Sequence, residues 1–345
     1  MPPGSTVVSP PATALVLSGA VAKGAFQAGV LEQIASARIP IARIVAASAG
    51  AMNGAAFAAG VRYGRIDLAA DVIIETWLRD ATWLRFLRPS LVGLLRGGVS
   101  STRAVADVVL DGLARIAPTS PLPAPVADIA LQMVVAPLLG TSSARGSEMA
   151  IEGDTTFEYV TGFEGAAFDS DEGRRRLVTA VTASAAFPLL FAPVEIEGLG
   201  PCVDGGAVNN APVSVGLDSP EVTRVIVVTD SPRRVRDDEP PRGLDIVGRL
   251  AEMLVNERLF RDLAQSRKAN EKLARIEGLA DKWGLSPEQR AELVAALGWR
   301  AVELVQIRPE RPLDGTAFSG LHDRDLRARY IDQGREAAAR VLERL

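Results

Sequence analysis

Near the start of the chain, two short apolar runs are each followed by small residues and then by a helical pattern. Residues 13–17 (TALVL) form the first run, and the apolar spacing after them predicts a helix over residues 25–37. Residues 41–47 (IARIVAA) form the second, and an alanine-rich helix is expected to follow to about residue 59. Because strand, turn and helix succeed one another twice, the sequence predicts parallel strands joined by right-handed crossovers.

Further strand and helix patterns spread along the rest of the chain without an internal repeat. Strands are predicted at 129–136, 155–161, 224–229 and 301–307, and helices at 171–186, 244–277, 288–297 and 323–344. The segment 187–201, rich in Pro and Gly, is expected to be irregular. The sequence therefore predicts an α/β protein with a three-layer α/β/α fold and a mostly parallel central sheet.

The expected organisation is one domain with additions. Residues 1–12, rich in Pro and Ser, are predicted to be a flexible arm, and residues 13–345 to be the domain. Within it, residues 66–125 are expected to form a helical lid insertion. The sequence pattern assigns no role to a second helical region, residues 231–300.

Composition excludes several classes of protein. Of the 345 residues, 48% are hydrophobic and 23% are charged, which excludes general disorder. The net charge of −4 argues against a general nucleic-acid binder. One cysteine and one histidine exclude an internal disulfide, a thiolate metal cluster and any mechanism that needs two histidines. No metal or organic cofactor is expected, and without a membrane-spanning or signal-like segment a cytoplasmic location is expected.

The first candidate for chemistry is Ser48, which lies between a predicted strand and a predicted helix. Its neighbours Ala46, Ala47, Ala49 and Gly50 resemble the G-x-S-x-G nucleophile elbow, with Ala46 in place of the first glycine. A sharp turn of this kind exposes a serine above the sheet, beside the amino end of the next helix. The alternative is a serine that only caps an ordinary helix.

The second candidate is the loop between the first strand and its helix. Such a loop can point backbone N–H groups at an oxyanion. A phosphate-binding loop is disfavoured, because that motif places Lys after its second glycine whereas Lys23 precedes Gly24. The predicted oxyanion hole comprises Gly19, Ala20, Val21, Ala22, Lys23 and Gly24.

The third candidate is Asp204, followed by Gly205 and Gly206. In isolation an Asp-Gly-Gly sequence is most often a turn. A nucleophilic serine needs a base, however, and the chain offers either Asp204 or its one imidazole, His322. His322 precedes the last predicted helix, where a role in helix entry is the simpler interpretation. Asp204 is therefore the better candidate base for Ser48.

Together these segments resemble the patatin-like phospholipases, lipid acyl hydrolases with a Ser-Asp dyad. The resemblance is carried by residues 15–34 (LVLSGAVAKGAFQAGVLEQI), 44–55 (IVAASAGAMNGA) and 183–213, which contain the Asp-Gly-Gly motif. It implies that Ser48 is the nucleophile, Asp204 the general base and the 19–24 loop the oxyanion hole. Two departures stand out, because the family usually has consecutive glycines where this chain has Ala20 and Val21, and has glycine where it has Ala46.

A segment rich in Trp, Leu and Arg, residues 77–96, is a candidate for contact with lipid. Apolar groups beside cations are typical of interfacial segments, although a helical cover that packs on the sheet would show the same pattern. The candidate contact residues are Trp77, Trp83, Leu84, Arg85, Phe86 and Arg88.

Two functional hypotheses follow. The first is a serine hydrolase of carboxylic esters in lipids, of the phospholipase A, lysophospholipase or carboxylesterase type, which works through an acyl-enzyme. Its partners would be a phospholipid or other acyl ester and, peripherally, a membrane surface, with no nucleic acid. The alternative is a lipid-binding or regulatory protein of the same fold, with weak or no catalysis because of Ala20 and Val21.

Overall fold

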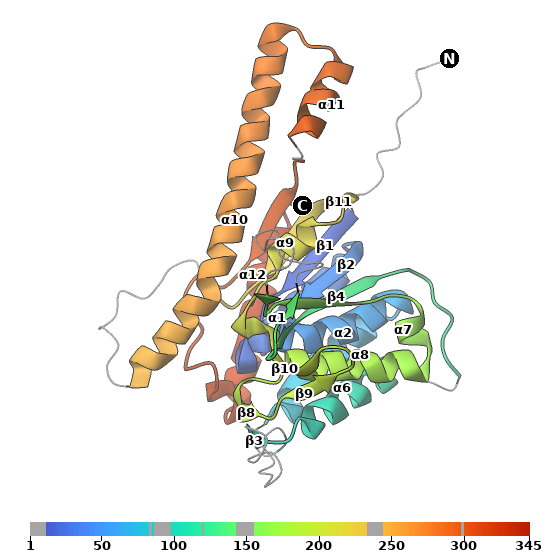
Figure 1. Cartoon of the computed structure of the whole chain (residues 1–345). Helices are drawn as coiled ribbons and strands as arrows, with labels where there is room; N and C mark the ends of the chain where they lie inside the picture. Colours follow the sequence, from blue (N-terminus) through green and yellow to red (C-terminus); the bar gives the residue numbers. More distant parts are fainter. Residues whose placement is uncertain are drawn as a thin grey trace.

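A central mixed sheet organises the chain, as the computed structural model in Figure 1 shows. The structure describes residues 12–82, 85, 98–118, 121–142, 155–232, 244–297 and 300–345. The predicted arm lies, apart from residue 12, outside the described residues.

The sheet has eight strands in the order β12-β11-β1-β2-β4-β10-β9, with β7 paired to β4 as well. The run from β12 to β4 is parallel, and β7, β10 and β9 are added antiparallel at the other edge. Its strands are β1 (Ala12–Leu17), β2 (Ile41–Ala46), β4 (Ala130–Pro137), β7 (Tyr159–Phe163), β9 (Val194–Ile196), β10 (Gly200–Asp204), β11 (Val222–Val228) and β12 (Glu303–Ile307). The prediction of a mostly parallel sheet is confirmed.

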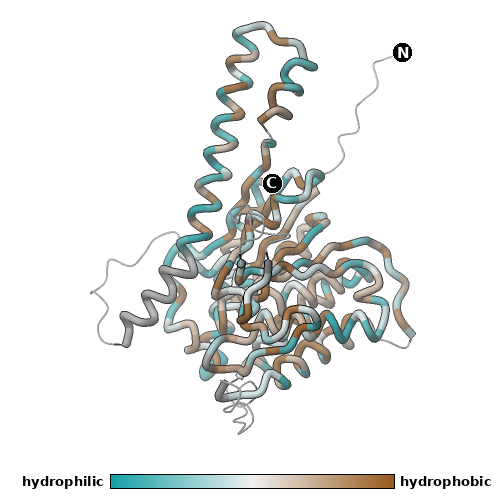
Figure 2. Tube along the Cα trace, viewed as in Figure 1, coloured by the Kyte–Doolittle hydropathy of each residue, from teal (hydrophilic) through white to brown (hydrophobic). Residues whose placement is uncertain are grey.

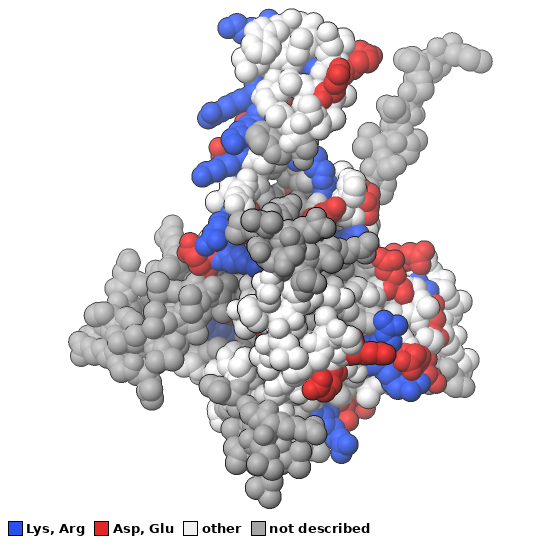
Figure 3. All heavy atoms as spheres, viewed as in Figure 1, with Lys and Arg blue, Asp and Glu red and all other residues white. Residues whose placement is uncertain are grey.

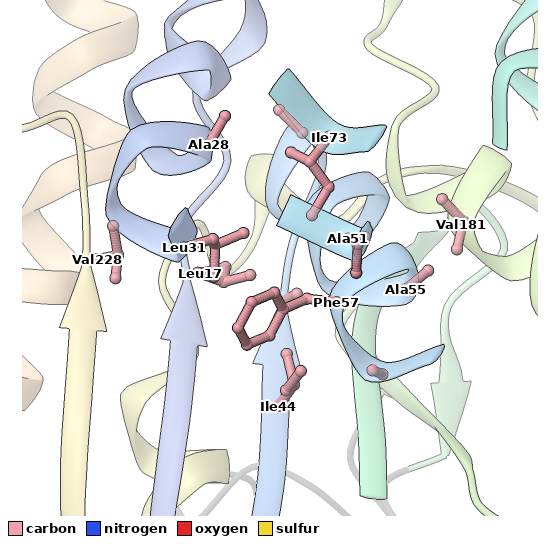
Figure 4. Packing of buried hydrophobic residues seen from close by; sticks show 14 of the residues in the cluster. Leu17, Ala28, Leu31, Ile44, Ala51, Ala55, Phe57, Ile73, Val181 and Val228 are labelled. Atoms are coloured by element: carbon pink, nitrogen blue, oxygen red, sulfur yellow. The ribbon is translucent and has the colours of Figure 1, made fainter. Parts of the chain in front are cut away.

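Both faces of the sheet are buried, and β1 shows why. Leu15 and Leu17 point into the larger core cluster, while Ala14 and Val16 point into a second cluster on the opposite face. Alternate side chains of a strand lie on opposite faces, so a strand between two helical layers must be apolar throughout. Figure 4 shows part of the larger cluster, in which Leu17 of β1 lies beside Leu31 and Ile44 of β2 lies beside Phe57.

Helices form the two outer layers. On the face of the larger core lie α1 (Gly24–Ser36), α2 (Ala49–Arg62), α3 (Ile66–Glu75), α6 (Arg103–Ile116), α8 (Asp171–Ser184) and α12 (Arg324–Leu342). The other face is covered by α9 (Val213–Leu217) and α10 (Leu244–Trp283). Figure 2 shows apolar residues concentrated through this layered body. The three-layer α/β/α prediction is confirmed.

The segment 187–201 is not irregular, so that prediction was wrong. It contains β8 (Leu189–Phe191), which pairs with β3 (Gly98–Ser100), and the β9-β10 hairpin. Strands of three residues are too short to show a period, and Gly198 and Gly200, both at positive φ, allow the tight hairpin turn. Asp204 is the last residue of β10, the second strand of this hairpin.

The long helix α10 extends six residues beyond the predicted end and projects from the body with α11 (Pro287–Ala296), as Figure 1 shows. Leu259 and Leu263 of α10 are buried in the second core cluster and pack this part of the helix against the sheet. Asn270 then exchanges hydrogen bonds with the backbone of Val302.

In Figure 3, basic side chains gather along one edge of this projection. From residue 257 onward, the exposed basic residues of α10 are Arg261, Arg267, Lys268, Lys272, Arg275 and Lys282.

The described part of the expected lid, residues 66–125, includes α3, the π-helical turn η2 (Thr76–Asp80), β3 and α6. Val72 and Ile73 of α3 and Val108 of α6 are buried in the larger core. These helices therefore belong to the same layer as α2, and a lid motion of the segment stays a prediction.

Candidate active site

Ser48 lies at the turn between β2 and α2, with φ 53° and ψ −126°. A non-glycine residue in this region is strained and persists only where its surroundings hold it. Ser184 of α8 provides that hold, because its hydroxyl accepts a hydrogen bond from the Ser48 N–H at 3.0 Å and donates one to Val134 O at 2.7 Å. Sequence reasoning missed Ser184, whose role depends on a contact across the fold.

Small residues around Ser48 are required by crowding at the turn. Ala46, Ala47 and Ala49 are buried, so the alanine in place of the first glycine of the motif fits without displacing the turn. At Gly50 a Cβ would collide with the carbonyl oxygen of Leu17. The strand-turn-helix context expected for a nucleophile elbow is present.

Asp204 lies directly opposite the serine although the two are 156 positions apart. Ser48 Oγ donates to Asp204 Oδ2 at 2.6 Å, and the Gly206 N–H donates to Asp204 Oδ1 at 2.7 Å. Gly205 and Gly206 begin the short 3-10 helix η3 (Gly205–Ala207), so the predicted Asp-Gly-Gly turn also positions the carboxylate. The serine is 7% exposed and the aspartate 3%.

Burial raises the pKa of Asp204 to about 7, while hydrogen bonds from the Ser48 hydroxyl and the Gly206 amide act in the opposite direction. A carboxylate with this pKa is a stronger base than an ordinary aspartate. It is matched to proton transfer near neutral pH. His322, the other candidate base, is exposed, and Ser48 Oγ has its hydrogen bond to Asp204 instead.

The predicted oxyanion loop lies beside the serine as η1 (Val21–Lys23) and the residues around it. Val21 has φ 47°, so it adopts a left-handed backbone conformation that glycine adopts without strain. Lys23 N–H donates to Ala20 O at 2.9 Å, and Ala22 N–H donates to Ala317 O at 3.1 Å. Lys23 is buried, and Gly24 begins α1.

Unpaired amides remain around the serine. Within the described part of the chain, the N–H groups of Ala20, Val21 and Ala49 have no hydrogen-bond partner. Val21, Ser48 and Ala49 line one pocket. These amides are therefore candidate donors to an oxyanion, and Ala49, at the first position of α2, adds the helix's positive end.

Asn210 fixes the loop in place and was also missed from the sequence. Its side-chain Nδ2 donates to Gly19 O at 3.0 Å, and its own carbonyl oxygen accepts from the Gly19 N–H at 2.9 Å. Asn210 follows Asp204 by six positions, so one short segment positions both the candidate base and the predicted oxyanion loop. Its position within the family-like stretch 183–213 was the only signal available.

An apolar pocket of about 550 Å³ opens beside Ser48. It is lined by Val21, Ser48, Ala49, Met52, Trp77, Val105, Ala185, Phe187, Leu190, Phe191 and Leu321. Apart from the serine hydroxyl, these side chains are apolar except for the indole N–H. The pocket suits a hydrocarbon chain attached to a carbonyl at Ser48.

The candidate lipid-contact residues separate into two groups. Trp77 is buried in the pocket wall. Arg85 is paired with Asp80 and, at 3.3 Å, with Asp111. Trp83, Leu84, Phe86 and Arg88 lie outside the described residues.

Two kinds of feature are absent from the described residues. They contain no group of three or more His, Cys, Asp or Glu side chains arranged to hold a metal ion. Within the same ranges no helix has both the length and the apolar character needed to cross a membrane.

Comparisons with known proteins identify a family model that matches this chain and solved structures that resemble it. Comparison with curated proteins gives no match. Among solved structures, the crystal structure of VipD from Legionella pneumophila is similar over 97% of this chain and 67% of its own, at 15% identity and a TM-score of 0.44. The family model described as Patatin-like phospholipase matches residues 15–217, which is more than half of the chain and includes Ser48 and Asp204. The chain therefore belongs to the patatin-like phospholipase family.

Proposed function

We propose that this protein hydrolyses acyl esters of lipids with Ser48 as nucleophile and Asp204 as general base. Membership of the family supports lipid acyl hydrolysis in general. The observation that carries the finer proposal is the 2.6 Å hydrogen bond from Ser48 Oγ to Asp204 Oδ2, at the wall of an apolar pocket.

In the first half of the reaction, Ser48 Oγ attacks the acyl carbonyl carbon while its proton passes to Asp204 Oδ2. The carbonyl oxygen becomes an oxyanion, which the unpaired amides of Ala20, Val21 and Ala49 stabilise. When the tetrahedral intermediate collapses, the C–O bond to the alcohol breaks. Asp204 returns the proton to the leaving alcohol, and the acyl group stays on Ser48.

In the second half, water replaces the alcohol. Asp204 accepts a proton from the water as its oxygen attacks the acyl-serine carbonyl, and the same amides stabilise the second oxyanion. Collapse breaks the bond to Ser48 Oγ, which regains the proton from Asp204, and the fatty acid leaves. One base of pKa about 7 serves both halves, and no step requires a histidine or a metal.

The substrate class follows from the pocket. Its lining is apolar and adjoins the serine, so it accepts the acyl chain, while the alcohol part must point towards the opening. Phospholipids, lysophospholipids and simpler carboxylic esters all meet this requirement. Peripheral contact with a membrane through residues 77–96, and a cytoplasmic location, stay predictions.

The alternative of a binding protein without catalysis rested on Ala20 and Val21. Val21 adopts positive φ and keeps its amide free, so the substitution does not by itself remove an oxyanion donor. We therefore do not propose that alternative.

Site-directed substitution tests the dyad. Ser48→Ala and Asp204→Asn should each lower kcat on a p-nitrophenyl acyl ester by at least about 10³-fold, because each removes a group that acts in both half-reactions. A fluorophosphonate probe should label wild-type protein at Ser48 in one-to-one stoichiometry and leave Ser48→Ala unlabelled.

The chain offers matched controls. Ser36→Ala and Asp71→Asn change exposed residues of α1 and α3 and should keep wild-type rates and labelling. Circular dichroism and thermal unfolding establish that each variant is folded. Wild-type turnover in folded Ser48→Ala or Asp204→Asn protein would refute the dyad.

A further inference from the structure

A second apolar pocket, of about 440 Å³, lies behind the first and away from the serine. It is enclosed by α2, α3, the π-helical turn η2 and α6, and is lined by Met52, Asn53, Ala56, Val72, Ile73, Thr76, Trp77, Ala81, Val108, Val109, Gly112 and Leu113. No step of the proposed reaction uses it.

Met52 and Trp77 line both pockets, so these two side chains form the partition between them. The indole is 5% exposed and lies against α1, because a Cβ at Gly24 would come within 2.5 Å of the ring. Indole Nε1 donates to Asn53 Oδ1 at 2.8 Å. Trp77 therefore has a fixed position between the two spaces.

The partition is anchored to the catalytic machinery. Asn53 Nδ2 donates to Gly24 O at 3.1 Å and to Gln27 Oε1 at 3.0 Å, and Gln27 Nε2 donates to Ser18 O at 2.6 Å. Ser18 and Gly24 are the residues at either end of the oxyanion loop. The backbone of the turn is held separately, by Arg327 Nη2 donating to Leu78 O at 3.2 Å. A π-helical turn inside a helical segment often marks a functional site.

The chemistry of the second pocket limits its occupant. Its two polar side chains are already engaged: Thr76 Oγ1 donates to Val72 O at 2.7 Å, and the Asn53 amide has the three bonds described above. A headgroup or sugar placed there would find no free side-chain partner and would lose its hydration. A hydrocarbon chain has no polar group whose hydration would be lost on entering the pocket.

We propose that the second pocket is a latent subsite for the distal part of a long acyl chain, and that Trp77 sets the acyl-chain length this protein accepts by closing it. The proposal rests on the proposed function, since it assumes that the acyl chain enters from Ser48. In wild-type protein the chain ends against the indole. With the indole removed, the two pockets become one channel from Ser48 to α6.

The expected size follows from the burial of methylene groups. Each methylene that enters an apolar site contributes about fourfold to kcat/KM, equivalent to ~0.8 kcal/mol. The lining of the second pocket along α6 runs from Val108 to Leu113, which at ~1.5 Å per residue is about 7.5 Å, enough for several methylenes. Four additional methylenes would raise kcat/KM about 200-fold.

The test measures kcat/KM for esters of unbranched acids from four to sixteen carbons. For wild-type protein, kcat/KM should rise with each added carbon up to a limiting chain length, called the break below, and should then stay level or decline. Trp77→Ala should move the break to longer chains and raise the ratio of long-chain to butanoyl kcat/KM by about 10²-fold. The ratio cancels any difference in the fraction of folded enzyme.

Three further variants separate channel opening from general damage. Trp77→Phe loses the bond to Asn53 but keeps a ring, so its break should stay at or near the wild-type length. Gly112→Leu added to Trp77→Ala should restore the wild-type break, because a side chain at 112 fits beside Val72, 3.7 Å away, and projects into the second pocket. Trp283→Ala, at an exposed tryptophan of α10, should match wild type throughout.

Calorimetric binding of free fatty acids of the same lengths gives a readout that does not require catalysis. The subsite is supported, even if Ser48 is not the nucleophile, when the break in affinity moves to longer chains in Trp77→Ala and goes back to the wild-type length on addition of Gly112→Leu. Ser48-dependent hydrolysis with the same break in wild type and folded Trp77→Ala, in both rate and binding, would overturn the subsite while leaving the dyad intact.

Discussion

Lowering the pH from 8 to 5 should reduce kcat/KM for ester hydrolysis about 90-fold, because Asp204 must be ionised to accept the Ser48 proton. Burial raises the pKa of this carboxyl to about 7. The ionised fraction is then about 90% at pH 8, about 50% at pH 7, about 9% at pH 6 and about 1% at pH 5. An aspartate with the ordinary pKa would still be more than about 90% ionised at pH 5.

The assay should use a neutral, water-soluble short-chain ester and chromatographic detection of the acid, since the absorbance of p-nitrophenol itself changes with pH. Values of kcat/KM report the titration of the free enzyme. Samples returned from pH 5 to pH 8 must regain full activity, which excludes unfolding as the cause. The profile should rise with unit slope and level off above pH 8.

His322 is the one histidine of the chain, and it is exposed. His322→Gln provides the control and should reproduce the wild-type profile. A rate that is constant from pH 8 to pH 5, or a midpoint that disappears in His322→Gln, would refute the assignment of the titration to buried Asp204.

Two further substitutions test the supports of the site. Val21→Gly should change kcat by less than about threefold, because the valine already has the backbone conformation of a glycine; an increase of ~10² to 10³ would instead show that valine had cost an oxyanion donor. Ser184→Ala should lower kcat with little change in KM and destabilise the protein by about 1–3 kcal/mol, since it leaves the buried Ser48 N–H and Val134 O without their partner. Denaturant unfolding and steady-state kinetics of the same samples measure both effects, and unchanged kcat in Ser184→Ala would remove its role in holding the turn.

Most of the sheet could be predicted because its parallel strands are buried on both faces. Runs such as TALVL at 13–17 and IARIVAA at 41–47 are mostly apolar, with Arg43 the one charged residue in the second, and each is followed by a helix that covers it. The short strands β3, β8 and β9 carry no such signal. β3 and β8 are strands because each supplies hydrogen bonds to the other from a distant segment, and β9 is one because β10 folds back on it in a hairpin.

The two residues of the proposed dyad could be picked out from the sequence because they lie in motifs, whereas the residues that support them could not. Ser48 lies among small residues after the buried strand β2, and Asp204 is recognised by the two glycines that follow it. Ser184 and Asn210 act on backbone atoms of Ser48 and Gly19, contacts that only the folded sheet creates. Trp77 was a candidate for lipid contact, with packing on the sheet as the alternative, and the structure buries it in the wall of the pocket.

Burial raises the basicity of Asp204, the proposed base, and the same burial has a thermodynamic consequence. Because its pKa in the folded state is above the ordinary value, the group favours folding fully below about pH 4 and loses that contribution as pH rises through about 7. The catalytic form is thus the form that the fold tolerates least. Two of the three described non-glycine residues at positive φ, Val21 and Ser48, lie at this same site. The buried carboxyl of Asp204 and the strained backbone at Val21 and Ser48 therefore lie together, next to the ends of β1 and β2. The hydrogen bonds that Ser184 and Asn210 make to the backbone of Ser48 and Gly19 help to hold this strained backbone in place.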